Sequence, residues 1–393
     1  MEAYPSELLL IAFAAMLAPL LAELPTGFRL PVVVLEVMLG ILIGPHMLHL
    51  ASPDGMIATM AELGLAFLLF MVGLEIDFDK IRGRPAVLAI GGWFLSLFVA
   101  LACMFIFSMI GLIQAPPLLA AVALSTTALG VLAPILRDRG ELDSAFGTYM
   151  VAAAAAGEFG PLMIISLLLI PTHDTFLHGL FMVTFIIIAF IAANLALNAR
   201  SMRLIEMMKR TMQSSGQLPV RICILLQILF VALAAEFGLN IVMGAFAAGI
   251  VAGLVIKGKQ GELLLQKLDA IGYGFLIPIF FIVAGMNFDV SALWSAPLAP
   301  LQVALLSGLL VLVRGVPLVL YKKELTPDER LPFAFYSATG LPLIVIISEI
   351  GVSSGLMQPD RAAILVSAGM VSVLLFPILA VKLRGKFSLF HQP

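Results

Sequence analysis

Long runs of apolar residues, interrupted by Pro, Gly and charged residues, recur along the whole chain. A helix needs about 20 apolar residues to cross the hydrocarbon core of a bilayer, and the interruptions cut the sequence into segments of about that length. The pattern therefore predicts an all-α polytopic membrane protein with about thirteen transmembrane helices. We expect the spans near residues 6–24, 31–49, 56–75, 86–112, 117–136, 144–170, 176–198, 219–236, 240–256, 264–285, 298–321, 329–351 and 361–382.

The composition agrees with this pattern. Hydrophobic residues make up 62% of the chain and charged residues 12%, against about 25% charged in a soluble domain. The near balance of 22 basic and 24 acidic residues gives no signal for nucleic-acid binding. Both cysteines, Cys103 and Cys223, lie in apolar runs, so we expect neither a disulfide framework nor a metal cluster, and no cofactor. The run Leu8–Leu24 lacks a basic leader and a cleavage site, so it is expected to stay as a membrane helix.

The basic residues fall on alternate loops between the spans. Under the positive-inside rule, this alternation places the N-terminus outside and the C-terminus in the cytoplasm. The opposite loops hold only Arg361, and Arg314 lies inside a span. The predicted cytoplasmic residues are Arg29, Lys80, Arg82, Arg84, Arg137, Arg139, Arg200, Arg203, Lys209, Arg210, Arg221, Lys257, Lys259, Lys267, Lys322, Lys323, Arg330, Lys382, Arg384 and Lys386.

Three short stretches of the first half reappear in the second half at nearly constant offsets. Gly40–Gly44 resembles Gly249–Gly253, Ser125–Thr127 resembles Ser337–Thr339, and the pair 156–157 resembles the pair 368–369, with offsets of 209, 212 and 212 residues. Each pair is seven spans apart, an odd number, so the two halves must cross the membrane in opposite senses. Inverted repeats of this kind are typical of transporters, with the site near mid-membrane between the repeats.

Glu158 is a single carboxylate in the middle of the sixth span, after five alanines (152–156) and Gly157. A charge at that depth costs about 2.5–3.5 kcal/mol on insertion scales, so such a residue usually faces a cavity or a partner and marks an ion or proton path. The alanines give a smooth face against which another helix can pack closely. We expect Glu158 to be the ion- or proton-binding acid; the alternative is a packing segment with a structurally hydrogen-bonded Glu.

Two spans carry the signs of a helix that is broken at mid-membrane. In the fifth span, Ser125, Thr126, Thr127 and Gly130 precede Pro134; in the twelfth, Ser337, Thr339 and Gly340 precede Pro342. Gly and Pro interrupt helices, and hydroxyl groups can satisfy the freed backbone groups. Matching broken helices in two repeats are a good sequence pointer to an ion site. We expect Ser125, Thr126, Thr127 and Thr339 to line it, although each hydroxyl could simply hydrogen-bond between helices.

Arg314 is the second charge inside a span. We expect it to pair with a carboxylate or with carbonyl groups of the broken helices, because an unpaired buried charge is too costly to keep. The alternative is that its long side chain reaches the cytoplasmic surface. The other carboxylates near the spans lie closer to span ends, where we expect water to reach them and interhelical hydrogen bonding to be their default role: Glu36, Glu62, Glu75, Glu236 and Glu349.

Four stretches carry a family resemblance: 39–45 (LGILIGP), 61–75 (AELGLAFLLFMVGLE), 123–128 (ALSTTA) and 280–286 (FFIVAGM). They resemble the membrane domain of Kef-like cation:proton antiporters, relatives of the Nha-type sodium/proton exchangers. The resemblance covers the whole chain. It implies a thirteen-helix homodimer with two crossed, broken helices, with Glu158 at the family's ion-binding acid and Arg314 at its basic residue. That family usually has Asp at the acid position, preceded by Asp, Asn or Gln; here the pair is Gly157–Glu158.

We therefore predict a secondary antiporter that exchanges K⁺ or Na⁺ for protons across a cell inner membrane, and we expect the exchange to be electroneutral. Glu158 would bind either the cation or a proton. Residues 1–393 would form a single membrane domain, without the cytoplasmic nucleotide-binding domain that usually follows in Kef proteins. The alternatives are a sodium-coupled symporter of an organic anion on the same fold and a channel-like conductance. An enzyme is not expected, because all five histidines fall in outside loops or the tail and leave no evident catalytic base: His46, His49, His173, His178 and His391.

Overall fold

The computed structural model describes residues 4–24, 32–76, 81–112, 115–142, 144–168, 175–198, 211–212, 214–255, 259–288 and 298–388. Within these residues every regular element is a helix, which confirms the all-α prediction. Several residues used in the charge and histidine arguments lie outside the described residues: Arg29, Lys80, Arg200, Arg203, Lys209, Arg210, Lys257, His173 and His391.

Each predicted span coincides with one helix or with consecutive helical segments. Among the described residues, eight helical stretches are long and apolar enough to cross a membrane, and five shorter apolar helices account for the remaining spans. Large apolar side chains point away from the protein along several of them; on the fourth span, for example, Phe98 is 70% exposed and Phe94 is 59% exposed. Lipid is the solvent that accepts such faces, so the chain is a multi-pass membrane protein.

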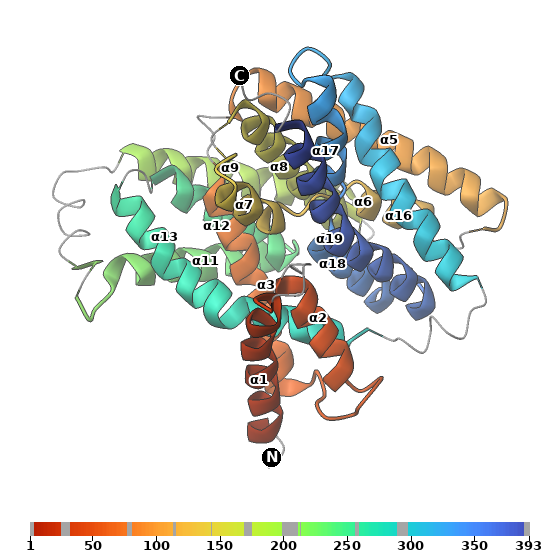
Figure 1. Ribbon diagram of the computed structural model, residues 1–393. Coiled ribbons are helices and arrows are strands. Elements are labelled where there is room, and N and C mark those ends of the chain that lie inside the picture. The colour runs from red at the N-terminus through yellow and green to blue at the C-terminus, as the bar shows by residue number, and fades with distance from the viewer. Residues whose placement is uncertain are drawn as a thin grey trace. The chain divides into compact units, whose positions relative to one another are not determined.

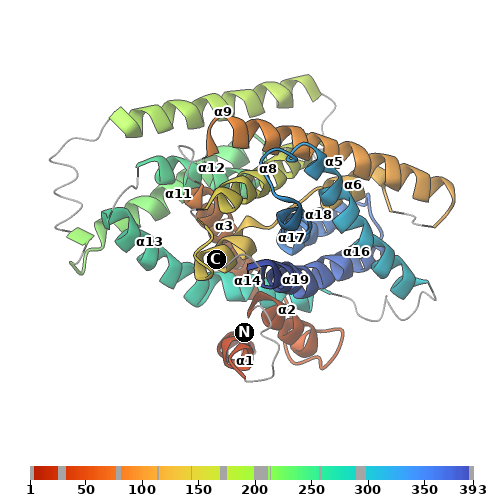
Figure 2. The same cartoon turned by 45° about the horizontal axis from the view of Figure 1, so that its top comes forward.

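The first of two compact units comprises Met1–Pro53, Asp79–Ile164 and Ala284–Pro393. Within it α19 packs against α16, α17 and α18, and α5 packs against α6 and α16 (Figures 1 and 2). Its helices are α1 (Tyr4–Ala22), α2 (Val32–Ile43), α5 (Arg84–Met109), α6 (Pro117–Leu124), α7 (Leu129–Asp138), α8 (Ala145–Leu168, up to Ile164), α16 (Ala299–Gly315), the 3₁₀ turn η2 (Val316–Val319), α17 (Pro327–Ser337), α18 (Leu341–Ser353) and α19 (Pro359–Ser388).

The second unit comprises Asp54–Phe78 and Ile165–Val283. Within it α12 packs against α3, α9 and α11. The tenth predicted span is continuous here: a single π-helical turn, η1, joins two α-helices. The helices of this unit are α3 (Gly55–Glu75), α9 (Thr175–Asn198), α11 (Leu218–Glu236), α12 (Ile241–Val255), α13 (Lys259–Ile271), η1 (Gly272–Leu276) and α14 (Ile277–Met286, up to Val283).

Glycines allow the same close helix contact in both repeats. A Cβ atom at Gly44, the residue after α2, would lie 2.8 Å from the Cα of Met286 at the end of α14. In the other unit, a Cβ at Gly249 of α12 would overlap the backbone of Phe70 in α3. Within the first unit, the second span therefore packs on the end of the tenth, from Ala284 onward, and within the second unit the ninth packs on the third. This reciprocal arrangement is what an inverted repeat with a seven-span offset requires, and the small residues permit it by letting the backbones approach.

Local sequence signals position the interrupted helices. Pro116 and Pro117 begin α6, and Leu341–Pro342 begin α18; proline suits the first helical turn because its missing N–H would have no partner there. At the start of α17, the Glu329 carboxylate accepts a hydrogen bond from the Thr326 N–H (3.0 Å), as in a capping box. These signals fix where each half-helix begins, and hence where its dipole ends lie.

Candidate functional site

Both predicted interruptions are present, and they contact each other. The fifth span is broken at residues 125–128, between α6 and α7, and the twelfth at residues 338–340, between α17 and α18. The Ala128 N–H donates to the Thr339 carbonyl (2.7 Å), and the Thr127 hydroxyl donates to the Ser337 carbonyl (2.6 Å). The two broken helices therefore satisfy each other's backbone groups at the point where they meet, inside the first unit.

Glu158 lies on α8 beside this meeting point. Its side chain is only 2% exposed, and its Oε2 accepts a hydrogen bond from the Leu129 N–H (3.3 Å), the first residue of α7. The preceding residue contributes too, because the Thr127 N–H donates to the Gly157 carbonyl (3.1 Å). A helix N-terminus carries a partial positive charge and free N–H groups, so it stabilises a carboxylate there.

Arg314 of α16 joins four other segments. Its side chain is 5% exposed, so it does not extend to the membrane surface. Nε donates to the Ser337 carbonyl (3.2 Å), Nη1 to the Ser125 carbonyl (3.3 Å) and to the Ser96 hydroxyl of α5 (3.2 Å), and Nη2 to the Ala153 carbonyl of α8 (3.3 Å). The expected pairing with carbonyl groups of the broken helices is the one observed. Ser125 and Ser337 end α6 and α17, where the helix dipole favours a cation.

The four predicted hydroxyl residues all lie at the interruptions, and Ser125, Thr126, Thr127 and Thr339 have no exposed surface. Each hydroxyl donates to a backbone carbonyl: Ser125 to Val122 (2.8 Å), Thr126 to Ala123 (2.7 Å), Thr127 to Ser337 and Thr339 to Phe335 (3.2 Å). Their first role is thus to satisfy the freed carbonyls. A hydroxyl that donates its hydrogen still keeps oxygen lone pairs, so a cation could accept one as a ligand.

Gly157 is required by the crowding beside Glu158. A Cβ atom at this position would lie 2.8 Å from the Thr127 hydroxyl oxygen and 3.0 Å from Nη2 of Arg314. Both atoms are held in place by the hydrogen bonds described above. The space that a side chain at 157 would need is therefore filled by Arg314 and Thr127, and Glu158 is left as the acid of this pair of positions.

The two repeats differ at the equivalent helix starts. The N–H of Gly340, just before α18, donates to the hydroxyl of Ser372 on α19 (3.2 Å). With the offset of 212 residues, the counterpart of Glu158 is Met370. One half-helix start thus meets a carboxylate and the other a neutral hydroxyl.

The sequence did not single out Ser96 or Ser372, because an isolated serine in an apolar helix carries no distinguishing pattern. Ala153 belongs to the alanine run 152–156, but nothing in that run indicated that its carbonyl would accept from Arg314. The expectation that water reaches all the remaining carboxylates was wrong for Glu36: Glu62, Glu236 and Glu349 are exposed, but Glu36 of α2 is only 4% exposed. Among the described residues, no group of three His, Cys, Asp or Glu side chains could hold a metal ion.

Comparisons with known proteins agree on one kind of protein. A family model described as "Sodium/hydrogen exchanger, transmembrane" matches residues 11–381. The chain is 28% identical to YjbQ of Bacillus subtilis, covering 96% of this chain and 63% of YjbQ. It is 23% identical to the Na(+)/H(+)-K(+) antiporter GerN of Bacillus cereus, covering 93% of each. It is 26% identical to the glutathione-regulated potassium-efflux system protein KefC of Escherichia coli, covering 96% of this chain and 60% of KefC.

The fold is also that of a solved structure. The sodium proton antiporter MjNhaP1 of Methanocaldococcus jannaschii matches with a TM-score of 0.67 over 98% of this chain and 97% of that chain, at 16% sequence identity. At that identity the likeness concerns the fold.

Proposed function

The chain belongs to the sodium/hydrogen exchanger family, and from that membership we propose that it is a secondary antiporter exchanging a monovalent cation for protons across a membrane. The observation that carries the proposal is Glu158, buried inside a membrane span with its Oε2 at the first N–H of α7. Buried ionisable residues in membrane spans are characteristic of ion and proton paths. Broken helices that meet there place carbonyl and hydroxyl oxygens close by.

In the exchange, Glu158 binds either a proton or the cation. The α7 N-terminus stabilises the ionised carboxylate after the proton leaves and before the cation binds. Neutral oxygen ligands for the cation come from Ser125, Thr126, Thr127 and Thr339. Arg314 holds the C-terminal ends of α6 and α17 and balances their dipoles without leaving its charge unsatisfied. The site changes the side of the membrane that it faces only when Glu158 holds a proton or the cation. Competition between the two ions for this one side chain therefore couples the two gradients.

The cation is K⁺ or Na⁺. The names of the relatives differ on this point: GerN is named for both ions and KefC for potassium. A symporter of an organic anion would need space and a polar cradle beside the acid. The hydroxyls around Glu158 are instead buried and engaged with backbone carbonyls, which favours a bare monovalent ion over an organic solute.

The setting of this antiporter is an inner membrane, with the N-terminus outside and the C-terminus in the cytoplasm, and residues 1–393 act as one membrane domain. Support for the orientation comes from the basic residues on alternate loops. The resemblance to Kef-like antiporters supports a homodimer as the functional form.

The test is proton flux in proteoliposomes driven by imposed gradients of K⁺, Na⁺ or Li⁺. We expect Glu158→Gln to abolish cation-driven flux, because an amide does not bind and release a proton at physiological pH. Glu62→Gln, which changes an exposed carboxylate on α3, is the matched control and should retain exchange. Full exchange by a folded Glu158→Gln protein would refute the role of Glu158.

A further inference from the structure

Pro161 lies inside α8, three residues after Glu158, and both residues are buried. In an α-helix the N–H of each residue donates to the carbonyl four residues earlier, and proline has no N–H to donate. The carbonyl that loses its donor in α8 is therefore that of Gly157, the residue before the acid. Gly157 is buried as well, so its carbonyl needs a donor from elsewhere.

This donor comes from the interruption of the fifth span. The Thr127 N–H donates to the Gly157 carbonyl at 3.1 Å. The ring of Pro161 also crowds this carbonyl and turns it away from the axis of its own helix. The bond that α8 lacks is thus replaced by a bond to a neighbouring span. It forms at the crossing, the place where the interruptions at residues 125–128 and 338–340 meet.

The replacement bond bears on Glu158 because its donor lies close to the donor that reaches the acid. Leu129, two residues after Thr127, donates its N–H to Oε2 of Glu158 (3.3 Å), the residue that follows the freed carbonyl. Between them, the Ala128 N–H donates to the Thr339 carbonyl (2.7 Å). Three successive N–H groups of the interruption therefore have three different acceptors. Holding Thr127 on α8 holds the Leu129 N–H at the acid.

The second repeat has no proline at the equivalent position. With the offset of 212 residues, the counterpart of Pro161 is Val373 of α19, and the counterpart of Gly157 is Gly369. Valine keeps the N–H that a helix directs to the carbonyl four residues earlier, so α19 does not release the Gly369 carbonyl as α8 releases its own. This repeat connects its interruption to α19 through a side chain instead.

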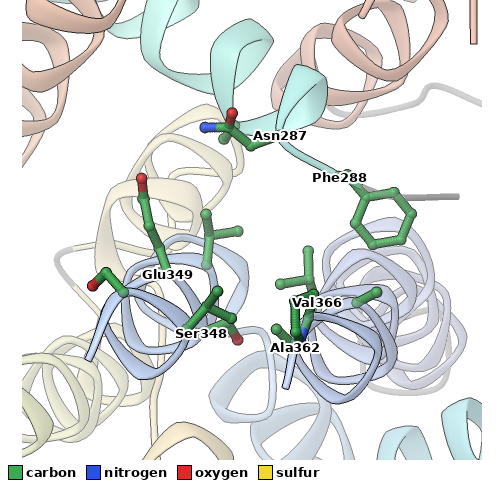
Figure 3. Close-up of a pocket in the computed structure, with 12 residues that line it drawn as sticks. Asn287, Phe288, Ser348, Glu349, Ala362 and Val366 are labelled. Atoms are coloured by element: carbon green, nitrogen blue, oxygen red, sulfur yellow. The ribbon is translucent and has the colours of Figure 1, made fainter. Parts of the chain in front are cut away.

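Ser372 is that side chain. Its hydroxyl donates to the Gly369 carbonyl (2.7 Å) and accepts from the N–H of Gly340, which precedes α18 (3.2 Å). The link lies at the crossing end of α18; farther along, α18 and α19 line the cavity shown in Figure 3. The position equivalent to Ser372 in the first repeat is Gly160, which has no side chain to make such a link. One repeat bridges to the carbonyl with a serine, and the other frees the carbonyl with a proline.

Gly160 also allows α8 to accommodate the proline. A proline ring crowds the Cβ of the residue before it and so disfavours a helical conformation there, and glycine has no Cβ. The aromatic ring of Trp93 on α5 takes the space, because a Cβ at Gly160 would overlap it. Trp93 therefore packs directly on the backbone of α8 beside Pro161.

We propose that Pro161 is a positioning residue for ion binding at Glu158. By leaving the Gly157 carbonyl without a donor from α8, it attaches the interruption of the fifth span to this helix and holds the Leu129 N–H against the carboxylate. An N–H restored at position 161 should close the hydrogen bond within α8, release Thr127 and weaken the stabilisation of the ionised acid. The effect on transport rests on the proposed function, whereas the attachment concerns the folded protein alone.

Amide hydrogen exchange, measured residue by residue on the purified full chain in nanodiscs, tests the attachment without transport. We expect Pro161→Ala to speed exchange of the Thr127 and Leu129 amides about tenfold, the effect of losing one buried hydrogen bond on local opening. Pro377→Ala is the matched control and should leave both amides unchanged. Pro377 is a buried proline within α19, and among the described residues no backbone N–H of another segment donates to the Val373 carbonyl, four residues earlier.

Pro161→Gly restores the same N–H with a residue that favours a helix less than alanine does. The two variants share the restored N–H and differ in helix propensity, so both should show the faster exchange although their unfolding temperatures differ. The proposal is overturned if the Thr127 and Leu129 amides remain as protected in both variants as in the unmodified protein, because the Gly157 carbonyl would then hold both donors.

Transport in proteoliposomes measures whether the attachment acts on the acid. Pro161→Ala should raise the apparent KM for the cation about tenfold and change the maximal rate less, because a less stabilised carboxylate holds its proton more tightly against the cation. Pro377→Ala should leave both values unchanged. An unchanged KM in Pro161→Ala, or an equal change in the two variants, would overturn the positioning role. If the unmodified protein showed no exchange, the proposed function would fail, and amide exchange would still decide whether Pro161 makes the attachment.

Discussion

At the scale of single residues, Gly157 explains why the acid position holds one carboxylate. Alanine would favour the helix by up to about 1 kcal/mol, but its Cβ would lie 2.8 Å from the Thr127 hydroxyl and 3.0 Å from Arg314. Because both groups are fixed by hydrogen bonds, the crowding should dominate and cost about 1–3 kcal/mol.

We therefore predict that Gly157→Ala lowers the thermal unfolding temperature in detergent and impairs exchange. Gly308→Ala on α16 is the matched control, since a Cβ there meets nothing within 4 Å; it should unfold at the wild-type temperature or above. Equal unfolding temperatures for the two variants would contradict the crowding.

Arg314 contributes through the geometry of its hydrogen bonds as well as through its charge. It donates to three carbonyls and one hydroxyl from four segments. Lysine keeps the charge but has three donors on one nitrogen and cannot reach the same acceptors with one geometry. Arg314→Lys should therefore destabilise the protein by about 1–3 kcal/mol, the cost of leaving a buried group unsatisfied.

Thermal unfolding of the purified protein measures this effect. Arg84→Lys is the comparison, because Arg84 pairs with Glu324 at 2.8 Å but is 56% exposed, and exposed pairs contribute at most about 1 kcal/mol. A tolerated Arg314→Lys, with stability and exchange intact, would show that the charge alone matters.

At the scale of the elements, the positions of the helices and of their interruptions could be predicted from the sequence, but the side-chain contacts between them could not. Thirteen apolar runs, two Gly- and Pro-marked interruptions and a shared offset of 212 residues were enough to place the broken helices. They could not show that Thr127 would donate to Ser337, or that Arg314 would choose carbonyls over a carboxylate. Such contacts join residues about 20 to 220 positions apart, and no local pattern encodes them.

Thr127 and Thr339 connect the element scale to transport. Valine keeps the shape of threonine but removes the hydroxyl, so Thr127→Val and Thr339→Val should weaken apparent cation affinity more than they lower the maximal rate, if their oxygens contact the ion. KM and maximal rate in proteoliposomes separate the two effects. Thr59→Val, which removes an exposed hydroxyl near the start of α3 that donates to the Gly55 carbonyl, is the control. An unchanged KM in both valine variants would leave these hydroxyls with their structural role alone.

At the scale of the whole molecule, the inverted repeats are symmetric in backbone and asymmetric in charge. The α2–α14 and α12–α3 contacts repeat one arrangement, and Arg314 binds the equivalent carbonyls of Ser125 and Ser337. Yet the start of α7 meets Glu158, whereas Gly340 before α18 meets Ser372. Sequence comparison of the halves predicts the shared scaffold, because scaffold residues repeat. It could not predict the difference between the two helix starts, because that difference lies in positions that do not repeat between the halves.

We expect this asymmetry to determine the charge carried in each transport cycle. Position 157 is Gly, and Arg314 keeps its proton at any physiological pH, so Glu158 is the group left at the crossing to exchange a proton. One carboxylate that holds either a proton or a monovalent cation moves equal charge in both directions. Exchange should therefore be electroneutral, and a membrane potential, worth about 2.3 kcal/mol per charge per 100 mV, should not drive it.

Transport currents on a solid-supported membrane measure whether exchange moves net charge. A sustained current in step with exchange would contradict a single-acid cycle and direct attention to Glu36, the other buried carboxyl among the described residues of the first unit. Loss of that current in Glu36→Gln would identify Glu36 as the second proton carrier.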